Sequence, residues 1–355
     1  MQITSCDTPC LVYNISQLRK NLEFYKVHLP NKCKIVYATM ANDRKEILEF
    51  LYQSNIGFFV NSISHLELLQ EHQFDESQII FAASGNDLEE MHKINSSTAK
   101  FYIDSVKQFE LFQRIGSPKK IGIRLNISSL IDFELEVPFF SRIGIEKNEA
   151  ISLLEKHSDT IDSLHIYCGT NITSSSLYLL CIQKAFEIAK AFHNIKSIDI
   201  GGGFPLISSP YSKEILTDIK AAWEKNISGH EIDLIIEPGR ALVDNTASFY
   251  VKVNDIKYLN GRCIVLVNSS YTCYPRKVLH RSNEQAVFIL GKEELAEKIE
   301  VSICGNTTFS NDILTTCFLP EAEIGDVICF KNAGAYIENS YVSYLGAKKP
   351  TVIIN

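Results

Sequence analysis

The chain has 355 residues, 45% of them apolar, and its 35 basic and 42 acidic side chains leave a formal net charge of −7. This is the composition of an ordinary globular protein, and it excludes disordered and collagen-like chains. At roughly 150 residues per domain, the length predicts about two domains, or one large barrel with an appendage. The small acidic excess and the lack of long basic runs argue against nucleic acid or an anionic membrane as partner and favour small-molecule chemistry.

The N-terminal segment 1–7 lacks the basic and apolar regions of a signal peptide, and no later apolar run reaches the ~20 residues that a membrane span needs. We therefore expect a cytoplasmic protein. Ten cysteines are scattered singly, with no Cys-x-x-Cys pair and no clustered histidines. This pattern favours reduced thiols that serve as small apolar side chains over disulfides or a zinc site, and we expect no metal.

Eight short apolar runs recur between amphipathic segments at a mean spacing of roughly 29 residues, the length of a strand, a loop and a crossover helix. The runs are 33–39, 56–61, 78–83, 100–103, 120–125, 163–168, 196–200 and 233–236. Helical spacing of apolar side chains lies between them, for example in 66–69 and 177–189. Buried strands that alternate with helices indicate a parallel sheet covered on both faces. The pattern predicts an α/β protein with a (β/α)₈ TIM-type barrel over 28–245, and a doubly wound open sheet is the alternative.

After residue 245 the pattern changes to short alternating strands separated by turn signals such as Asn260-Gly261. The strands are expected over 248–253, 262–268, 286–290, 298–304 and 326–331. The opening segment 9–13 is also strand-like and precedes the barrel, so it is a candidate to pair with these strands. We therefore predict a β-rich domain, a sandwich or barrel, made of 1–27 and 246–355.

The residues that follow the barrel strands are the candidates for chemistry, because active sites of such barrels lie at the carboxyl ends of the strands. Gly201, Gly202 and Gly203 follow the seventh run directly, where bare backbone N–H groups can hold an anion; a plain tight turn is the alternative. Gly239-Arg240 after the eighth run favours the hypothesis of an anion site over that of a plain turn. Beside them, the carboxylate of Glu237 needs a cationic partner because it ends a buried strand. Arg124, Arg240 and a protonated ring nitrogen of a cofactor are the alternatives.

The motifs at these strand ends resemble those of the fold-type III pyridoxal-phosphate-dependent decarboxylases, the group that includes the ornithine, diaminopimelate and arginine decarboxylases. The resemblance spans nearly the whole chain, from 8–13 to 333–336. Its motifs are Tyr37-Ala38-x-x-Ala41-Asn42, Ser141-Arg142-Ile143-Gly144, His165-x-x-x-Gly169-Thr170, Gly201-Gly202-Gly203-Phe204, Glu237-Pro238-Gly239-Arg240 and Gly334-Ala335-Tyr336. It implies a barrel followed by a β-rich domain, and a homodimer with active sites at the interface.

Carried over to this chain, the resemblance implies a site for pyridoxal 5'-phosphate. The phosphate cradle would be formed by Thr170, Gly201, Gly202, Gly203, Gly239, Arg240 and Tyr336. Glu237 would pair with the pyridine nitrogen and keep it protonated, as the cofactor requires to accept an electron pair. Tyr167 takes the position of the aromatic residue that stacks on the ring, where many members have histidine.

The catalytic positions depart from the family pattern. The lysine that links the cofactor in the family corresponds here to Met40, and a thioether forms no imine, so the cofactor is expected to bind without a covalent link. Lys34 and Lys45 are poor substitutes, because one lies at the wrong end of its strand and the other a helical turn beyond the loop. The family's proton-donating cysteine and its acidic neighbour correspond to Thr308 and Phe309, and only Asp312 remains.

Three functions are open at this stage. The first is a decarboxylase-family enzyme that acts on a basic or diamino amino acid of the ornithine, lysine or diaminopimelate class. The second is a catalytically inactive paralogue that pairs with, or regulates, an active decarboxylase subunit as a heterodimer. The third is an ordinary decarboxylase into which Met40 was introduced. For the substrate, Asp312 suits a distal amine, and Arg276 either serves a substrate carboxylate from a shifted position or faces solvent.

Overall fold

The computed structural model describes residues 7–116, 119–131, 141–276 and 286–355. The chain divides into two compact units, Leu22–Ala241 and Met1–Asn21 with Leu242–Asn355. The divisions lie a few residues from the predicted limits of 28 and 245. In the described ranges, no helix is long and apolar enough to cross a membrane.

The first unit is built around a closed barrel of eight strands, β2 to β9, each parallel to its neighbours. The strands are β2 (Lys34–Ala38), β3 (Gly57–Val60), β4 (Ile79–Phe81), β5 (Lys100–Ile103), β6 (Ile121–Leu125), β7 (Ile161–Ile166), β8 (Ser197–Asp199) and β9 (Asp233–Ile236). Each coincides with one of the eight apolar runs, so the predicted TIM-type barrel is confirmed. The alternative of an open sheet is wrong, because β9 pairs with β2 and closes the barrel.

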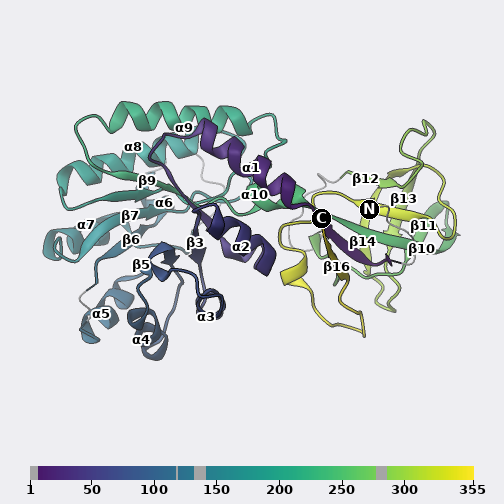
Figure 1. Cartoon of the computed structure of the whole chain (residues 1–355), viewed down its shortest axis with the longest axis horizontal. Helices are drawn as coiled ribbons and strands as arrows, with labels where there is room; N and C mark the ends of the chain where they lie inside the picture. The colour runs from purple at the N-terminus through teal and green to yellow at the C-terminus, as the bar shows by residue number, and fades with distance from the viewer. Residues whose placement is uncertain (1–6, 117–118, 132–140, 277–285) are drawn as a thin grey trace. The chain divides into compact units, whose positions relative to one another are not determined.

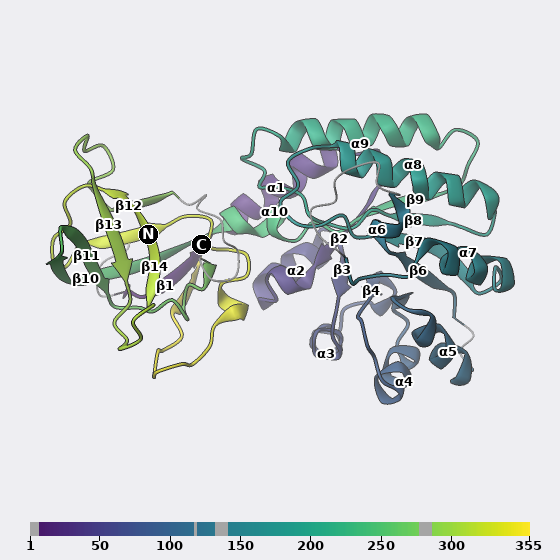
Figure 2. The same cartoon turned by 180° about the vertical axis from the view of Figure 1, so that it is seen from behind.

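Helices surround this barrel on the outside (Figures 1 and 2). They are α1 (Ile15–His28), α2 (Lys45–Gln53), α3 (Ile63–Glu71), α4 (Leu88–Ser96), α5 (Val106–Arg114), α6 (Ile127–Leu130), α7 (Lys147–Lys156), α8 (Ser176–Ala191) and α9 (Ser212–Asn226), with the 3₁₀ turns η2 (Thr39–Ala41) and η3 (Glu76–Gln78). Several begin at side-chain caps that satisfy free N–H groups, such as Ser62, Asp87 and Ser105. α3 and α8 contain the segments in which apolar side chains recur at helical spacing.

The barrel interior near β2 to β5 is filled by a hydrophobic cluster against which Met40 packs. The cluster consists of Val36, Phe59, Ile80, Ala82, Tyr102 and Ile235. Gly122 on β6 makes room for the Tyr102 ring, because a Cβ atom at Gly122 would lie 2.4 Å from a carbon of that ring. The tyrosine is therefore accommodated in the barrel only because its neighbour lacks a side chain.

The second unit is a β-rich domain with the strand order β12-β15-β10-β11-β13-β14, to which β1 and β16 add. Its elements are β1 (Cys10–Tyr13), α10 (Arg240–Val243), η4 (Asp244–Thr246), β10 (Ala247–Leu259), β11 (Arg262–Val267), β12 (Val287–Ile289), β13 (Ile299–Cys304), β14 (Ile313–Leu319), β15 (Val327–Phe330), η5 (Glu338–Ser340) and β16 (Thr351–Ile354). β1 pairs antiparallel with β10 and parallel with β16, so the expected pairing of the opening segment with this domain is confirmed.

The five strands expected after residue 245 all form, whereas β14 and β16 were missing from the prediction. β14 has two consecutive threonines that interrupt its apolar residues, and β16 is only four residues long. Short or half-polar strands are weak signals in a sequence, because their pairing depends on partners that lie far away along the chain. β16 is held by β1, more than 300 positions earlier.

We predict that Gly122→Ala lowers the free energy of unfolding by about 1 to 3 kcal/mol, because the added methyl group collides with the Tyr102 ring. Tyr102→Leu removes that ring, so the double variant Gly122→Ala/Tyr102→Leu is expected to lose less stability than the sum of the two single changes. Urea unfolding of the four proteins measures the coupling. Strict additivity would show that the two residues are not in steric conflict.

Candidate functional site

The candidate residues of the barrel unit all follow the carboxyl ends of its strands. Met40 follows β2, Tyr167 and Thr170 follow β7, the glycines 201–203 follow β8, and 237–240 follow β9. Because parallel strands end on the same side of a barrel, these positions share one face. Motifs that are far apart in the sequence therefore lie on neighbouring loops at one end of the barrel.

The loop after β8 has the conformation that glycine permits and other residues resist. Gly201 and Gly203 have φ values of +69° and +87°, and a Cβ atom at Gly202 would lie 2.5 Å from the carbonyl oxygen of Glu237. Among the described residues, the N–H groups of Gly202 and Gly203 have no hydrogen-bond acceptor. Two bare N–H groups in a glycine loop form a site that favours an anion.

The next loop, after β9, also depends on a close approach. A Cβ atom at Gly239 would lie 3.0 Å from the Cβ atoms of both Ala38 and Ala41, so this loop packs tightly on the end of β2. Arg240 follows as a mostly buried side chain at the start of α10. The loop after β9 and the loop after β2 thus meet beside the glycine loop.

Glu237 is the buried acid of this face. Its side chain is 4% exposed, and burial raises its pKa to about 7. The positive charge of Arg124 and a hydrogen bond with Asp199 both act to lower that pKa. Of the cationic partners proposed from the sequence, Arg124 therefore acts on Glu237 electrostatically. The Oε1 atom of Glu237 has no hydrogen-bond partner among the described residues. Its ion-pair contact is with Nε2 of His165, at 3.5 Å.

His165 and Asp199 complete a buried group of three with Glu237. His165 is fully buried on β7, and desolvation together with the positive charge of Arg124 lowers its pKa to about 3, so the ring is neutral. Asp199 accepts hydrogen bonds from the Gly201 N–H group at 2.9 Å and from the Tyr102 hydroxyl at 3.3 Å. Burial and the charge of Glu237 raise its pKa far above the usual range. One ligand atom from each member lies within 4.8 Å of the others, a spacing that a metal ion could bridge.

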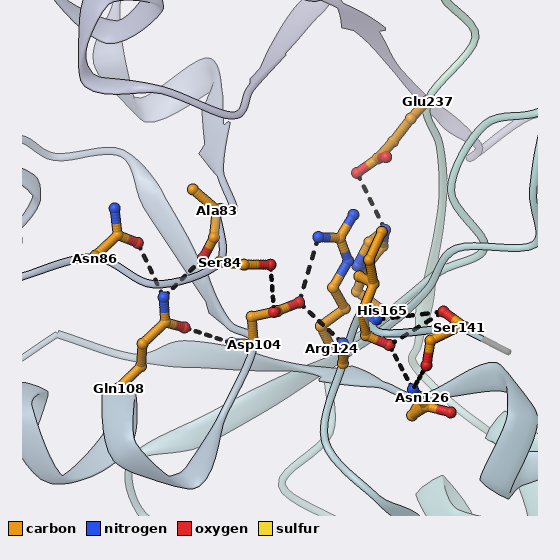
Figure 3. A network of polar contacts seen from close by, with 12 residues as sticks. Ala83, Ser84, Asn86, Asp104, Gln108, Arg124, Asn126, Ser141, His165 and Glu237 are labelled. Carbon is orange, nitrogen blue, oxygen red and sulfur yellow. Dashed lines mark hydrogen bonds and ion pairs between the residues drawn. The ribbon is translucent and has the colours of Figure 1, made fainter.

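A polar network extends from this group across the barrel (Figure 3). Arg124 on β6 forms an ion pair with Asp104 at 3.4 Å, and Asp104 accepts hydrogen bonds from Ser84 and from the Gly144 N–H group. Gln108 accepts from the Asp104 backbone. Arg124 and Asp104 are both nearly buried. Asp104 therefore holds the Arg124 guanidinium group in place, and the positive charge of that group lowers the pKa of Glu237.

The other barrel candidates line the same face. Tyr167 is half-buried, with its ring centroid 5.9 Å from Cζ of Arg124, and Thr170 is exposed. Met40 is half-buried against the hydrophobic cluster defined above. Its side chain therefore caps this cluster at the end of β2.

Lysines of the barrel lie elsewhere. Lys34 begins β2, at the amino end of the strand, and forms an ion pair with Asp233 at 2.7 Å. Lys100 begins β5 and pairs with Asp162. Both line a cavity of about 820 Å³ at the amino ends of the strands, opposite the face of Met40. Lys45 lies on α2, exposed and paired with Glu49.

Four further candidates, Tyr336, Arg276, Thr308 and Asp312, lie in the β-rich unit. Arg276 is 2% exposed, and its Nη1 and Nη2 atoms bind the Asp244 carboxylate at 2.9 and 2.8 Å. The prediction that it faces solvent is wrong, because the buried carboxylate draws the guanidinium inward. Tyr336 has a φ of +56°, an unusual backbone conformation for a tyrosine.

Asp312 is buried and serves as the hydrogen-bond centre of its loop. One oxygen accepts from the Ser270 hydroxyl and the Tyr271 N–H group, and the other from the N–H and hydroxyl groups of Thr307. Thr308 is exposed on the same loop. The carboxylate of Asp312 thus already binds four donors of its own chain.

The sequence reasoning assigned no role to His165 and Asp199. Both lie inside the expected strands, where a polar residue interrupts an otherwise apolar run. That interruption is the available signal, because a buried polar side chain must find partners. Which partners it finds depends on the pairing of β7 with β8 and of β8 with β9.

Comparison with known proteins gives consistent results. Residues 15–244 match the family model described as "Pyridoxal-dependent decarboxylase, pyridoxal binding domain". A diaminopimelate decarboxylase of Archaeoglobus fulgidus is 24% identical, with 93% of this chain and 83% of that protein covered. A lysine/ornithine decarboxylase of Selenomonas ruminantium is 25% identical, with 98% and 89% covered. The crystal structure of diaminopimelate decarboxylase from Helicobacter pylori complexed with L-lysine superposes with a TM-score of 0.86 at 21% identity, with 98% and 91% covered.

We predict that Glu237→Gln stabilises the protein without added ligands, and does so increasingly as the pH rises. The folded-state pKa of about 7 lies above the ordinary value of 4.5, so burial of the charge costs nothing below pH 4.5 and its full amount above pH 7. The gain in unfolding free energy should grow from near zero at pH 4.5 to about 3 kcal/mol at pH 8. Thermal unfolding across this range measures it. Glu231→Gln, at an exposed position nearby, is the control. If Glu237→Gln gave the same gain in unfolding free energy at pH 4.5 and at pH 8, the raised pKa of Glu237 would be contradicted.

Proposed function

Because this chain belongs to the pyridoxal-dependent decarboxylases, we propose that it binds pyridoxal 5'-phosphate at the carboxyl end of the barrel without a covalent link and acts on a basic or diamino amino acid. The observation that carries the proposal is the pairing of two complementary sites on adjacent strands. Bare N–H groups follow β8, and a buried carboxylate oxygen without a hydrogen-bond donor among the described residues follows β9.

The phosphate fits the glycine loop. The N–H groups of Gly202 and Gly203 are available to phosphate oxygens, and Arg240, which follows the neighbouring loop after β9, supplies positive charge. Thr170 and Gly239 belong to neighbouring loops on the same face, and Tyr336 is assigned to the cradle from the family motif. In this proposal these residues fix the position of the ligand, and none of them takes part in bond breaking.

The pyridine ring fits Glu237. A protonated ring nitrogen would donate a hydrogen bond to Oε1, the atom that lacks a donor, and its positive charge would stabilise the ionised carboxylate. When bound, the cofactor supplies an electron sink that accepts the electron pair left when carbon dioxide departs from the substrate. The role of Glu237 is to hold the proton on the ring nitrogen, and Tyr167 offers its ring face for stacking.

Met40 sets the covalent status of the ligand. Its half-buried thioether carries no amine, and the barrel lysines Lys34 and Lys100 are paired at the opposite ends of their strands. The cofactor is therefore proposed to be held by its phosphate, ring nitrogen and ring face alone. Loss of a local proton carrier lowers rates by ~10² to 10⁴, so turnover is expected to be slow.

The substrate class rests on the relatives. Their names are those of diaminopimelate and lysine/ornithine decarboxylases, and solved relatives hold L-lysine or putrescine. All of these compounds carry an amine far from the reacting carbon. Asp312 is the candidate for the distal amine from the family pattern alone, because both of its oxygens already accept hydrogen bonds within the chain. Arg276, the candidate for the substrate carboxylate, is likewise engaged, because both of its terminal nitrogens bind Asp244.

We predict that the wild-type protein with pyridoxal phosphate shows the absorbance of the free aldehyde and gives no protein adduct after borohydride reduction, as read by mass spectrometry. Met40→Lys should give one adduct per chain, because an amine then stands where the thioether was. Met40→Leu, similar in shape and without an amine, should bind the ligand as the wild type does.

An adduct on the wild-type protein would show that another lysine has taken the role, which contradicts the non-covalent assignment. Absence of any binding would contradict the cofactor proposal itself. Release of carbon dioxide from lysine, ornithine, arginine or diaminopimelate, measured on the loaded protein, then tests the substrate class.

The second candidate function is an inactive paralogue that pairs with an active decarboxylase subunit. It is favoured by the loop at 305–312, where the family's cysteine and acid correspond to Thr308 and Phe309. Asp312 in this loop already accepts hydrogen bonds from Ser270, Tyr271 and Thr307. The loop therefore lacks the cysteine and the neighbouring acid that the family brings to a partner's site. Purification from the native cell distinguishes the two candidates, because a homodimer with bound pyridoxal phosphate favours the enzyme and a mixed dimer favours the paralogue.

A further inference from the structure

The barrel interior beside Glu237 contains a histidine, His165, which heads the motif His165-x-x-x-Gly169-Thr170 and to which the proposed function gives no role. Its Nε2 atom lies 3.5 Å from Oε1 of Glu237, and both ring nitrogens lack hydrogen-bond partners among the described residues. A fully buried imidazole without partners is costly. A hydrogen bond between the ring and the neighbouring Glu237 carboxylate would offset this desolvation cost.

The orientation of the ring is fixed by packing. The His165 ring stacks on Tyr102, with centroids 5.1 Å apart and planes at 20°, and lies 6.0 Å from the ring of Phe59. Tyr102 is itself fixed because its hydroxyl donates to Asp199 and its ring fills the space left by Gly122. Nε2 is therefore directed at Glu237 by apolar contacts that have no chemical role of their own.

Charged and titratable side chains surround the His165 ring and Glu237. They are Arg124 from β6, Tyr102 and Asp104 from the β5 end, and Asp199 from β8. A carboxylate oxygen of Asp199 lies within 4.8 Å of the ligand atoms of His165 and Glu237, and Asp199 is held there by the Gly201 N–H group and the Tyr102 hydroxyl. Desolvation and the positive charge of Arg124 lower the pKa of His165 to about 3, so the ring beside Glu237 is neutral.

We infer that His165 is a positioning residue that keeps the Glu237 carboxylate directed at the ring nitrogen of the bound cofactor. The inference rests on the proposed function and adds one residue to it. Because no neighbour among the described residues fixes its tautomer, His165 can donate to an ionised Glu237 or accept from a protonated one. The neutral ring can therefore hold the carboxylate in either protonation state.

The test compares two ligands that differ only at the ring nitrogen, pyridoxal phosphate and its 1-deaza analogue, in which carbon replaces that nitrogen. The wild-type protein should bind pyridoxal phosphate about tenfold or more tightly than the analogue, because only the former pairs with Glu237. His165→Leu should reduce this ratio by about tenfold and leave the affinity for the analogue unchanged. His165→Gln, whose amide both donates and accepts, should restore most of the ratio.

Absorbance titrations of the bound ligand give the affinities and a second measurement. From about pH 6 to pH 9 the spectrum of the wild-type complex should stay constant, whereas that of His165→Leu should titrate as the ring nitrogen loses its proton. The exposed His193→Leu is the matched control.

Equal weakening of both ligands in His165→Leu would overturn the inference and leave the proposed function standing, because it would show a merely structural role. An unchanged ratio in both His165 variants would also overturn it. The inference would also be overturned if the wild-type protein bound one metal ion per chain and His165→Leu bound none, because the ring would then be a metal ligand. If the wild-type protein binds neither ligand, the proposed function fails and the inference fails with it.

Discussion

The burial of one carboxylate, that of Glu237, is the constraint around which the candidate site is arranged. An ionised group at the end of a buried strand loses its hydration, and the structure compensates only in part. The positive charge of Arg124 acts on it from β6, Asp199 on β8 lies within 4.8 Å, and His165 lies beside it on β7. No direct cation contacts its free oxygen within the described residues. The unfavourable free energy of burial that remains would be relieved by a positively charged hydrogen-bond donor. A protonated pyridine is such a donor.

The same face of the barrel offers the opposite charge preference one strand away. The Glu237 N–H group donates to the carbonyl of Gly201 at 2.8 Å, so the acid and the glycine loop are joined through the backbone. One loop is therefore suited to an anion and the next to a cation. A molecule with a phosphate at one end and a basic ring nitrogen at the other matches both, and the spacing between them is set by the barrel and not by mobile side chains.

In the proposed function, the residues that bind the cofactor and those at the positions of the chemical steps form separate groups. The groups assigned to hold the cofactor lie on strand ends and on loops whose glycines leave no space for other residues. Met40, Thr308 and Phe309 occupy the positions assigned to covalent attachment and proton transfer, and none of the three is acidic or basic. Asp312 keeps the family's carboxyl group, but its oxygens accept four hydrogen bonds from Ser270, Tyr271 and Thr307. A protein with this division is expected to bind its ligand well and to transform a substrate slowly.

The sequence by itself determined the architecture, because eight apolar runs at a regular spacing admit few arrangements other than a covered parallel sheet, and the glycine and Glu237 motifs marked the end of the barrel that carries the site. It did not determine the short strands β14 and β16, the inward position of Arg276, or the group formed by His165, Asp199 and Glu237. These depend on contacts between residues far apart in the chain, such as β1 with β16 and β7 with β8. A polar residue within an apolar run shows that a partner must exist, but only the closed barrel decides which partner lies within reach.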